Sequence, residues 1–190
     1  MRRKPWKIFA CVALAACAGC ASTGTTGGSA SGDRARSDKV PAETLRAAAD
    51  LIERQVYDGN REPTLGGIEG LVIDTPEIQQ AVRTRAARIE LVVNFLNSGH
   101  AWERPNGRLW IIRSEEYRKE ATSRRRDLDA IMVNGENRDR WTIYEGIIEA
   151  NGLPQSTLKD IELAFFDARR VFMTAGQKYE GPDGEPTQVQ

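Results

Sequence analysis

The sequence predicts a small, mostly α-helical domain of about four helices with one short β-hairpin. Three observations predict this fold class. Apolar residues recur every three or four positions in long stretches that glycine and proline separate, which is the period of an amphipathic helix. One Asn-Gly pair lies between aromatic and β-branched residues, which is typical of a hairpin turn. All three cysteines of the 190 residues fall within the first twenty, so the body of the chain must be stabilised by its core alone.

The first residues have the pattern of a lipoprotein signal peptide. Residues 1–7 carry four basic side chains and no acid, and residues 8–16 are uncharged. This uncharged run is too short to span a bilayer, which takes about 20 apolar residues. It ends in Leu14-Ala15-Ala16-Cys17, which resembles the lipobox of bacterial lipoproteins. We therefore expect residues 1–16 to be removed and Cys17 to be lipidated.

Residues 17–40 are expected to form a tether behind the lipidated cysteine. The stretch from Ser22 to Gly32 contains only serine, threonine, glycine and alanine, which cannot bury enough surface to order itself. Ala18 after the cysteine favours the outer membrane, facing the periplasm, if the host is a Gram-negative bacterium. The alternative reading of Cys17-Ala18-Gly19-Cys20 as a metal or redox pair lacks the further ligands that a tetrahedral site needs.

Residues 41–175 are expected to form the helical domain. A first helix follows Pro41 and ends near Gly59. A second begins at Asp74-Thr75-Pro76, a capping pattern with proline in the first turn, and ends at Gly99. We expect the arginines of the second helix to lie mostly outside its apolar stripe; these are Arg83, Arg85 and Arg88.

The hairpin is expected around Asn106-Gly107, and a third helix begins at Ser114. The sequence leaves open whether this helix continues through Gly135 to Ala150 or breaks at the glycine, which costs about 1 kcal/mol relative to alanine inside a helix. Its expected apolar side consists of Tyr117, Ala121, Leu128, Ile131 and Met132. A last helix carries Leu158 to Phe172, and residues 176–190 are expected to form a loose tail.

Two polar residues interrupt an apolar stripe after Met132. Asn137 and Arg140 share one helical face with Val133, Tyr144 and Ile147. A buried guanidinium needs partners. One hypothesis is that Arg140 and Asn137 bond the hairpin backbone or Glu103 and fix the hairpin to the helix. The other is that they line a groove for a carboxylate, a phosphate or a partner's backbone. The candidate partner- or ligand-binding residues are Glu103, Asn106, Gly107, Asn137, Arg140 and Tyr144.

Several segments resemble the YdbL-like family, small bacterial envelope proteins built around a domain of unknown function. Residues 99–109 are similar to its G-x-x-G-E-x-x-x-G-x-[LV] segment, with Trp102 where many members have glycine. Residues 136–144 are similar to its E-N-x-D-R-x-x-x-Y segment, Gly152-Leu153-Pro154 follows, and residues 175–179 are similar to its P-G-E-[WY]. The resemblance covers about residues 75–184 and implies a helical envelope domain with an accessory role beside a lipid-transfer protein.

These observations favour a membrane-anchored envelope lipoprotein that is a non-catalytic accessory or adaptor, serving intermembrane lipid transport or envelope maintenance. The alternative is a small lipid- or peptide-binding protein of the envelope, and the third hypothesis is a cell-wall hydrolase using paired carboxylates. No catalytic residue, metal or cofactor is predicted, and His100, the single histidine, is expected to be a packing or surface residue. Expected partners are the membrane through Cys17, an envelope protein and a lipid headgroup.

Nucleic acid is not an expected partner. The 27 basic residues balance 27 acidic ones, and Arg124-Arg125-Arg126 is followed directly by Asp127 and Asp129.

Overall fold

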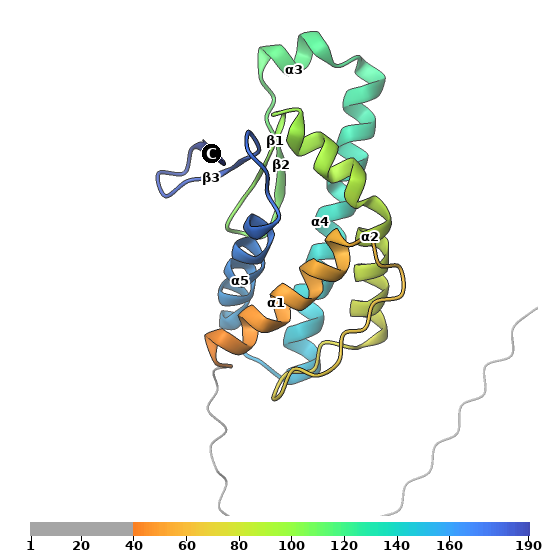
Figure 1. The fold of residues 1–190 in the computed structure, drawn as a ribbon, viewed down its shortest axis with the longest axis vertical. Coiled ribbons are helices and arrows are strands. Elements are labelled where there is room, and N and C mark those ends of the chain that lie inside the picture. Colours follow the sequence, from red (N-terminus) through yellow and green to blue (C-terminus); the bar gives the residue numbers. More distant parts are fainter. Residues whose placement is uncertain (1–39) are drawn as a thin grey trace, which may run out of the picture. The chain divides into compact units, whose positions relative to one another are not determined.

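A computed structural model describes residues 40–190, so the predicted signal peptide, Cys17 and nearly all of the tether lie outside the described residues. The described part is mostly α-helical, as predicted, and carries a small sheet (Figure 1). No helix within residues 40–190 combines the length and apolar character that a membrane span requires.

The first two helices follow the sequence signals. α1 (Ala42–Tyr57) buries an apolar face against α5 (Leu158–Val171). α2 (Pro76–Asn97) begins where the capping pattern predicts, since the hydroxyl of Thr75 accepts a hydrogen bond of 3.3 Å from the Ile78 N–H. Proline fits the first turn because its missing N–H would have no helical partner there.

The predicted hairpin is present and consists of β1 (Ala101–Glu103) and β2 (Leu109–Ile111), paired antiparallel. Gly107 in the connecting turn has a φ of 75°, a left-handed conformation that glycine adopts at little cost. Ala101, Glu103 and Leu109 point into the body of the domain and are fully buried.

The third predicted helix is interrupted, but at Ala121-Thr122 and not at Gly135. α3 (Glu115–Glu120) ends after two turns, and α4 (Ser123–Asn151) then runs without a break through Gly135. The break lies at Ala121-Thr122 because the Thr122 hydroxyl accepts from the Arg125 N–H and starts a new helix. α4 has 29 residues and packs mainly along α2. There are thus five α-helices in the described part of the chain, where about four were predicted.

The apolar side predicted for this segment is wrong in its middle. Leu128 and Ile131 are 54% and 68% exposed, whereas the neighbouring Asp129 is buried. Asp129 is held inside because its carboxylate accepts from the Tyr117 hydroxyl at 2.9 Å and from Arg125 Nε at 2.9 Å. A charged residue with two good partners therefore takes the inward position in place of the leucine.

The segment predicted as a loose tail extends the sheet. A short 3₁₀ turn, η1 (Gln155–Thr157), leads into α5, after which β3 (Lys178–Glu180) pairs parallel with β1. β4 (Pro186–Gln188) then pairs antiparallel with β3, which gives the strand order β2-β1-β3-β4. The polar and glycine-rich composition of these residues concealed strands of only three residues each.

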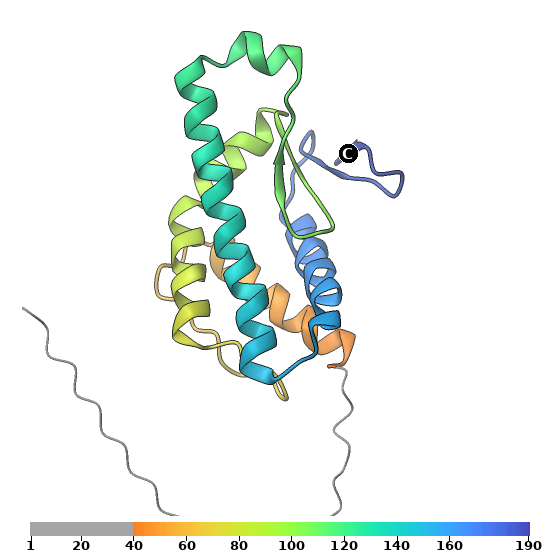
Figure 2. The same cartoon turned by 180° about the vertical axis from the view of Figure 1, so that it is seen from behind.

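The helices enclose one core beneath the hairpin. Figures 1 and 2 show α1 and α4 on opposite sides of the body, with α2 and α5 beside them. Ile52, Ile78, Phe95, Ile143 and Phe165 are among the residues of this core that are almost fully buried. Both views place α3 at the end of the body opposite the start of α1.

Candidate functional site

A bidentate ion pair attaches the hairpin to the longest helix. Arg140 of α4 donates from Nη1 and Nη2 to the two carboxylate oxygens of Glu103 at 2.7 and 2.8 Å, and neither side chain is exposed by more than 1%. Arg140 Nη1 also lies 3.2 Å from the carbonyl oxygen of Gly107 in the hairpin turn. These are the contacts of the first sequence hypothesis. Two parallel charge-assisted hydrogen bonds are strong and directional, so they fix the hairpin in one orientation.

The same two residues belong to a closed ring of alternating charges. Arg140 continues to Glu136 at 2.8 Å, and Glu136 to Arg85 at 2.8 Å. Arg85 contacts Glu53 at 2.9 Å, Glu53 contacts Arg169 at 3.1 Å, and Arg169 returns to Glu103 at 3.0 Å. The buried ionic ring consists of Glu53, Arg85, Glu136, Arg140, Glu103 and Arg169. It joins α1, α2, α4, α5 and β1, and its three positive and three negative charges cancel.

The ring lowers the pKa of two of its carboxylates, those of Glu103 and Glu136. Burial alone would raise the pKa of Glu136, but the guanidinium groups of Arg85 and Arg140 outweigh burial and hold its pKa well below the usual range. Burial likewise opposes ionisation of Glu103, whose pKa Arg140 and Arg169 lower. Isolated charges at such depth would be too costly to keep, so each ring member depends on its neighbours.

Four of the six ring residues, Glu53, Arg85, Glu136 and Arg169, were not among the candidate binding residues predicted from the sequence. Arg85 was expected mostly outside the apolar stripe of its helix, yet it is fully buried, whereas Arg88 is half-buried and bonds Glu136 and Asp139. Glu53, Arg85 and Arg169 each lie three or four positions from buried apolar residues of their own helices, as Arg140 does. That spacing was the available signal, and applied to every helix it would have found all three.

Asn137 and Tyr144 provide the other attachments of the hairpin. The Asn137 side-chain amide accepts from the Leu109 N–H at 2.8 Å and donates to the Leu109 carbonyl at 2.9 Å. The hydroxyl of Tyr144 lies 3.4 Å from the Gly107 carbonyl and accepts from Arg169 at 3.0 Å. A Cβ atom added at Gly107 would lie only 2.6 Å from the Tyr144 ring. Of the six candidate residues, Asn106 alone is exposed, and its side chain accepts from the Arg108 N–H.

The outer face of the hairpin carries aromatic and cationic side chains. Trp102 and Trp110 are cross-strand partners, and the Arg104 guanidinium lies 5.6 and 5.2 Å from their ring centres. Arg104 is also paired with Glu180 of β3. Trp110 is 48% exposed. We call Trp102, Arg104 and Trp110 the tryptophan face of the hairpin.

His100 and the paired carboxylates have local partners. His100 Nε2 lies 2.9 Å from a Glu120 carboxylate oxygen, and its ring packs on Tyr117 with centres 5.0 Å apart. Glu136 and Asp139, one of the carboxylate pairs on which the hydrolase hypothesis depends, both bond Arg88. Within residues 40–190 no group of histidine, cysteine, aspartate and glutamate side chains is arranged to hold a metal ion.

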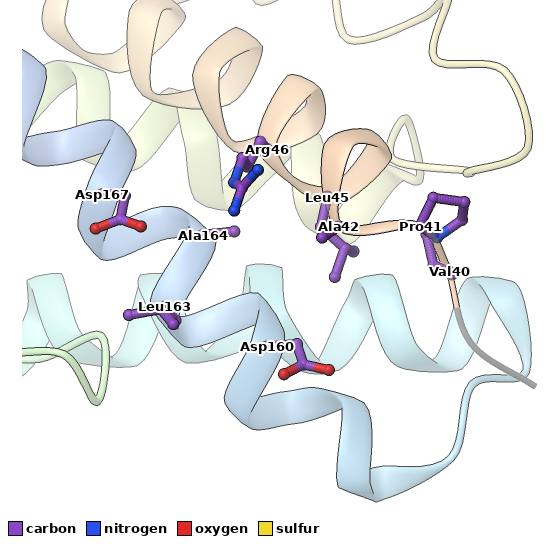
Figure 3. Close-up of a pocket in the computed structure, with 9 residues that line it drawn as sticks. All are labelled: Val40, Pro41, Ala42, Leu45, Arg46, Asp160, Leu163, Ala164 and Asp167. Atoms are coloured by element: carbon purple, nitrogen blue, oxygen red, sulfur yellow. The ribbon is translucent and has the colours of Figure 1, made fainter.

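Several surface cavities lie around the described part of the domain. One of about 350 Å³ separates the start of α1 from α5, and Figure 3 shows Leu45 and Arg46 on one wall and Asp160, Leu163 and Asp167 on the other. A second, of about 560 Å³, lies between the hairpin turn and the start of α5. A third, of about 340 Å³, lies where α3 meets α4.

Comparison of the chain with protein-family models, with curated proteins and with solved structures found no match.

Proposed function

We propose that this protein is a membrane-anchored lipoprotein of the bacterial cell envelope that acts as a non-catalytic accessory or adaptor. The lipobox-like Leu14-Ala15-Ala16-Cys17 supports the anchor, with the outer membrane as its expected site in a Gram-negative host. The segments that resemble the YdbL-like family support an accessory role in lipid transport or envelope maintenance. An adaptor of this kind works by holding its partner at high effective concentration near the membrane.

The observation that carries the proposal is the rigid mounting of the hairpin. The buried ionic ring and Asn137 fasten its inner side to α4 and α5, so its tryptophan face is presented in one orientation. A pre-organised surface loses little conformational entropy on binding. Tryptophan and arginine are also the residues that most often dominate the energy of protein interfaces. The tryptophan face is therefore our candidate partner-binding surface.

A pull-down from native membranes tests this proposal. Full-length protein with a C-terminal tag is isolated in mild detergent, and co-purifying proteins are quantified by mass spectrometry. We expect one envelope protein at near-stoichiometric yield, and we expect Trp110→Ala to reduce its recovery about tenfold or more, as truncation of a central interface tryptophan does. Trp110 lies on the outer side of an edge strand, so the variant should keep the helical circular dichroism of the parent.

The matched control is Leu91→Ala, which shortens an exposed apolar side chain of α2. Recovery of the partner should be unchanged in this variant. Equal recovery in Trp110→Ala, or the absence of any stoichiometric protein in the parent eluate, would contradict the adaptor proposal.

The anchor is tested separately by metabolic labelling with a palmitate analogue. Cys17→Ser should abolish labelling and release the protein from the membrane fraction, whereas Cys20→Ser should leave both unchanged. Labelling that is lost only in Cys20→Ser would contradict the assignment of the acceptor.

A further inference from the structure

The cavity between α3 and α4 combines arginines with apolar and aromatic side chains. It is lined by three arginines, one aspartate and three uncharged residues: Arg113, Arg118, Arg126, Asp127, Ile111, Tyr117 and Ala130. The ionisable side chains among them carry a net charge of +2. The volume of about 340 Å³ is within the range of small-ligand sites.

Three acids of α3 and α4 are already paired with other groups. Asp129 bonds Arg125 and Tyr117, Glu115 pairs with Lys119, and Glu120 contacts His100. By contrast, the guanidinium groups of Arg113 and Arg118 form no ion pair or hydrogen bond with any residue of the described part of the chain. Two permanent positive charges therefore face the cavity with Asp127 as the one acid in its wall.

The geometry of the third arginine makes the cavity a formed site. Arg126 Nη1 donates to the carbonyl oxygens of Ala121 and Arg118, which bridges the break between the two helices and fixes the guanidinium at the wall.

The first turn of α4 adds to the positive charge at this cavity. Arg124, Arg125 and Arg126 stand there with no acidic residue, at the positive end of the helix dipole. An anion bound at this place would relieve that concentration of positive charge.

We infer that this cavity binds a phosphate group. Arginine presents paired N–H donors that match the oxygens of a phosphate, and Arg113 and Arg118, which line the cavity without a partner in the described part of the chain, supply them. Ile111 and Tyr117 also line the cavity and offer apolar surface to the carbon atoms attached to the phosphate. A phospholipid headgroup and a free phosphate share this chemistry. This site is independent of the tryptophan face, so it does not rest on the adaptor proposal.

Isothermal titration of the full-length protein in a non-ionic detergent tests the inference. The two probes are inorganic phosphate and dihexanoyl phosphatidic acid below its micelle concentration, at constant ionic strength. We expect saturable binding of the phosphatidic acid, weakened about tenfold or more by Arg113→Gln/Arg118→Gln, since each charge-assisted hydrogen bond contributes at least that factor. The double variant changes only exposed side chains and should fold as the parent does.

The matched control is Arg54→Gln/Arg138→Gln, which removes two exposed arginines away from this cavity and should leave binding unchanged. Equal affinity for both probes identifies the phosphate alone as the ligand, and binding of phosphatidic acid only identifies a lipid headgroup. Either result supports the site. Absence of binding by both probes, or equal affinity in the cavity variant and the control variant, would overturn it.

Discussion

Arginine serves opposite purposes in two regions of this protein. In the buried ionic ring, Arg85, Arg140 and Arg169 are fully enclosed and each bonds two glutamates. In the lining of the cavity where α3 meets α4, Arg113 and Arg118 are exposed and have no partner within residues 40–190. The first group determines how the hairpin is mounted, whereas the second leaves positive charge available to a ligand. Residue type alone therefore says little about role; the difference comes from the partners.

The largest loss of stability is expected when one arginine of the buried ionic ring is removed. Arg140→Ala leaves Glu103 and Glu136 each short of a partner in the interior, and we expect a loss of about 3–5 kcal/mol in the free energy of unfolding. Urea denaturation followed by circular dichroism measures this loss. Arg138→Ala, two residues earlier on the same helix and exposed, should cost under about 0.5 kcal/mol. Similar costs for the two variants would show that the ring adds no more than a surface charge does.

Acid should weaken the ring without any substitution. The pKa values of Glu103 and Glu136 are lower in the folded protein than in the unfolded chain, where glutamate titrates near pH 4.5. The unfolded chain therefore takes up protons first as the pH falls. Their stabilising contribution is complete above about pH 5 and is lost progressively below it. The urea midpoint should be constant from pH 6 to 8 and should fall steeply towards pH 3; an unchanged midpoint at pH 3 would contradict this account.

The glycine of the hairpin turn tests how closely the turn packs against α4. Gly107→Ala forces a left-handed residue and places a methyl group against the Tyr144 ring, so we expect a cost of about 3 kcal/mol. Gly152 has a similar φ of 59° and open space around it, and Gly152→Ala should cost only about 1 kcal/mol. Thermal unfolding of the two variants measures the difference. Equal costs would indicate that the turn can move away from α4.

A smaller effect is expected from the amide that supports β2. Asn137→Ala removes both hydrogen bonds to the backbone of Leu109, a fully buried residue, and should cost about 1–3 kcal/mol. Amide hydrogen exchange reports it directly, because the Leu109 N–H should lose protection before the helices do. Retained protection at Leu109 in this variant would contradict the assignment.

The smallest change in stability is expected when the two exposed arginines of the cavity are replaced. Arg113→Gln/Arg118→Gln should change the free energy of unfolding by under about 0.5 kcal/mol in chemical denaturation, because neither side chain has a partner in the described part of the chain. A loss in the free energy of unfolding close to that of Arg140→Ala would show that these arginines stabilise the fold.

Much of the fold could be predicted from local signals, and what failed was non-local. The Thr75-Pro76 start of α2 and the Asn106-Gly107 turn are encoded in adjacent residues, and both were found. The contact of Arg140 with Glu103 could be predicted because a guanidinium stood alone on an apolar stripe. Closure of the ring through α1 and α5 depends on which helices meet, which periodicity does not specify.

The missed strands have a similar cause. β3 and β4 have three residues each; β3 gains its order from pairing with β1, and β4 from pairing with β3, so no local propensity marks them. The burial of Asp129 and the exposure of Leu128 likewise depend on Tyr117 and Arg125, which only the folded chain brings together.

Asn137 has a consequence beyond fastening the hairpin. Its side-chain amide occupies both backbone groups of Leu109 that an incoming strand would use at the outer edge of β2. At the opposite edge of the sheet, Pro186 in β4 has no N–H to offer. Both margins of this four-stranded sheet are thus blunted against further pairing. Under the proposed lipid anchor, the protein would be concentrated on a membrane and would meet copies of itself constantly; these two residues would hinder such copies from joining their sheets into a fibre.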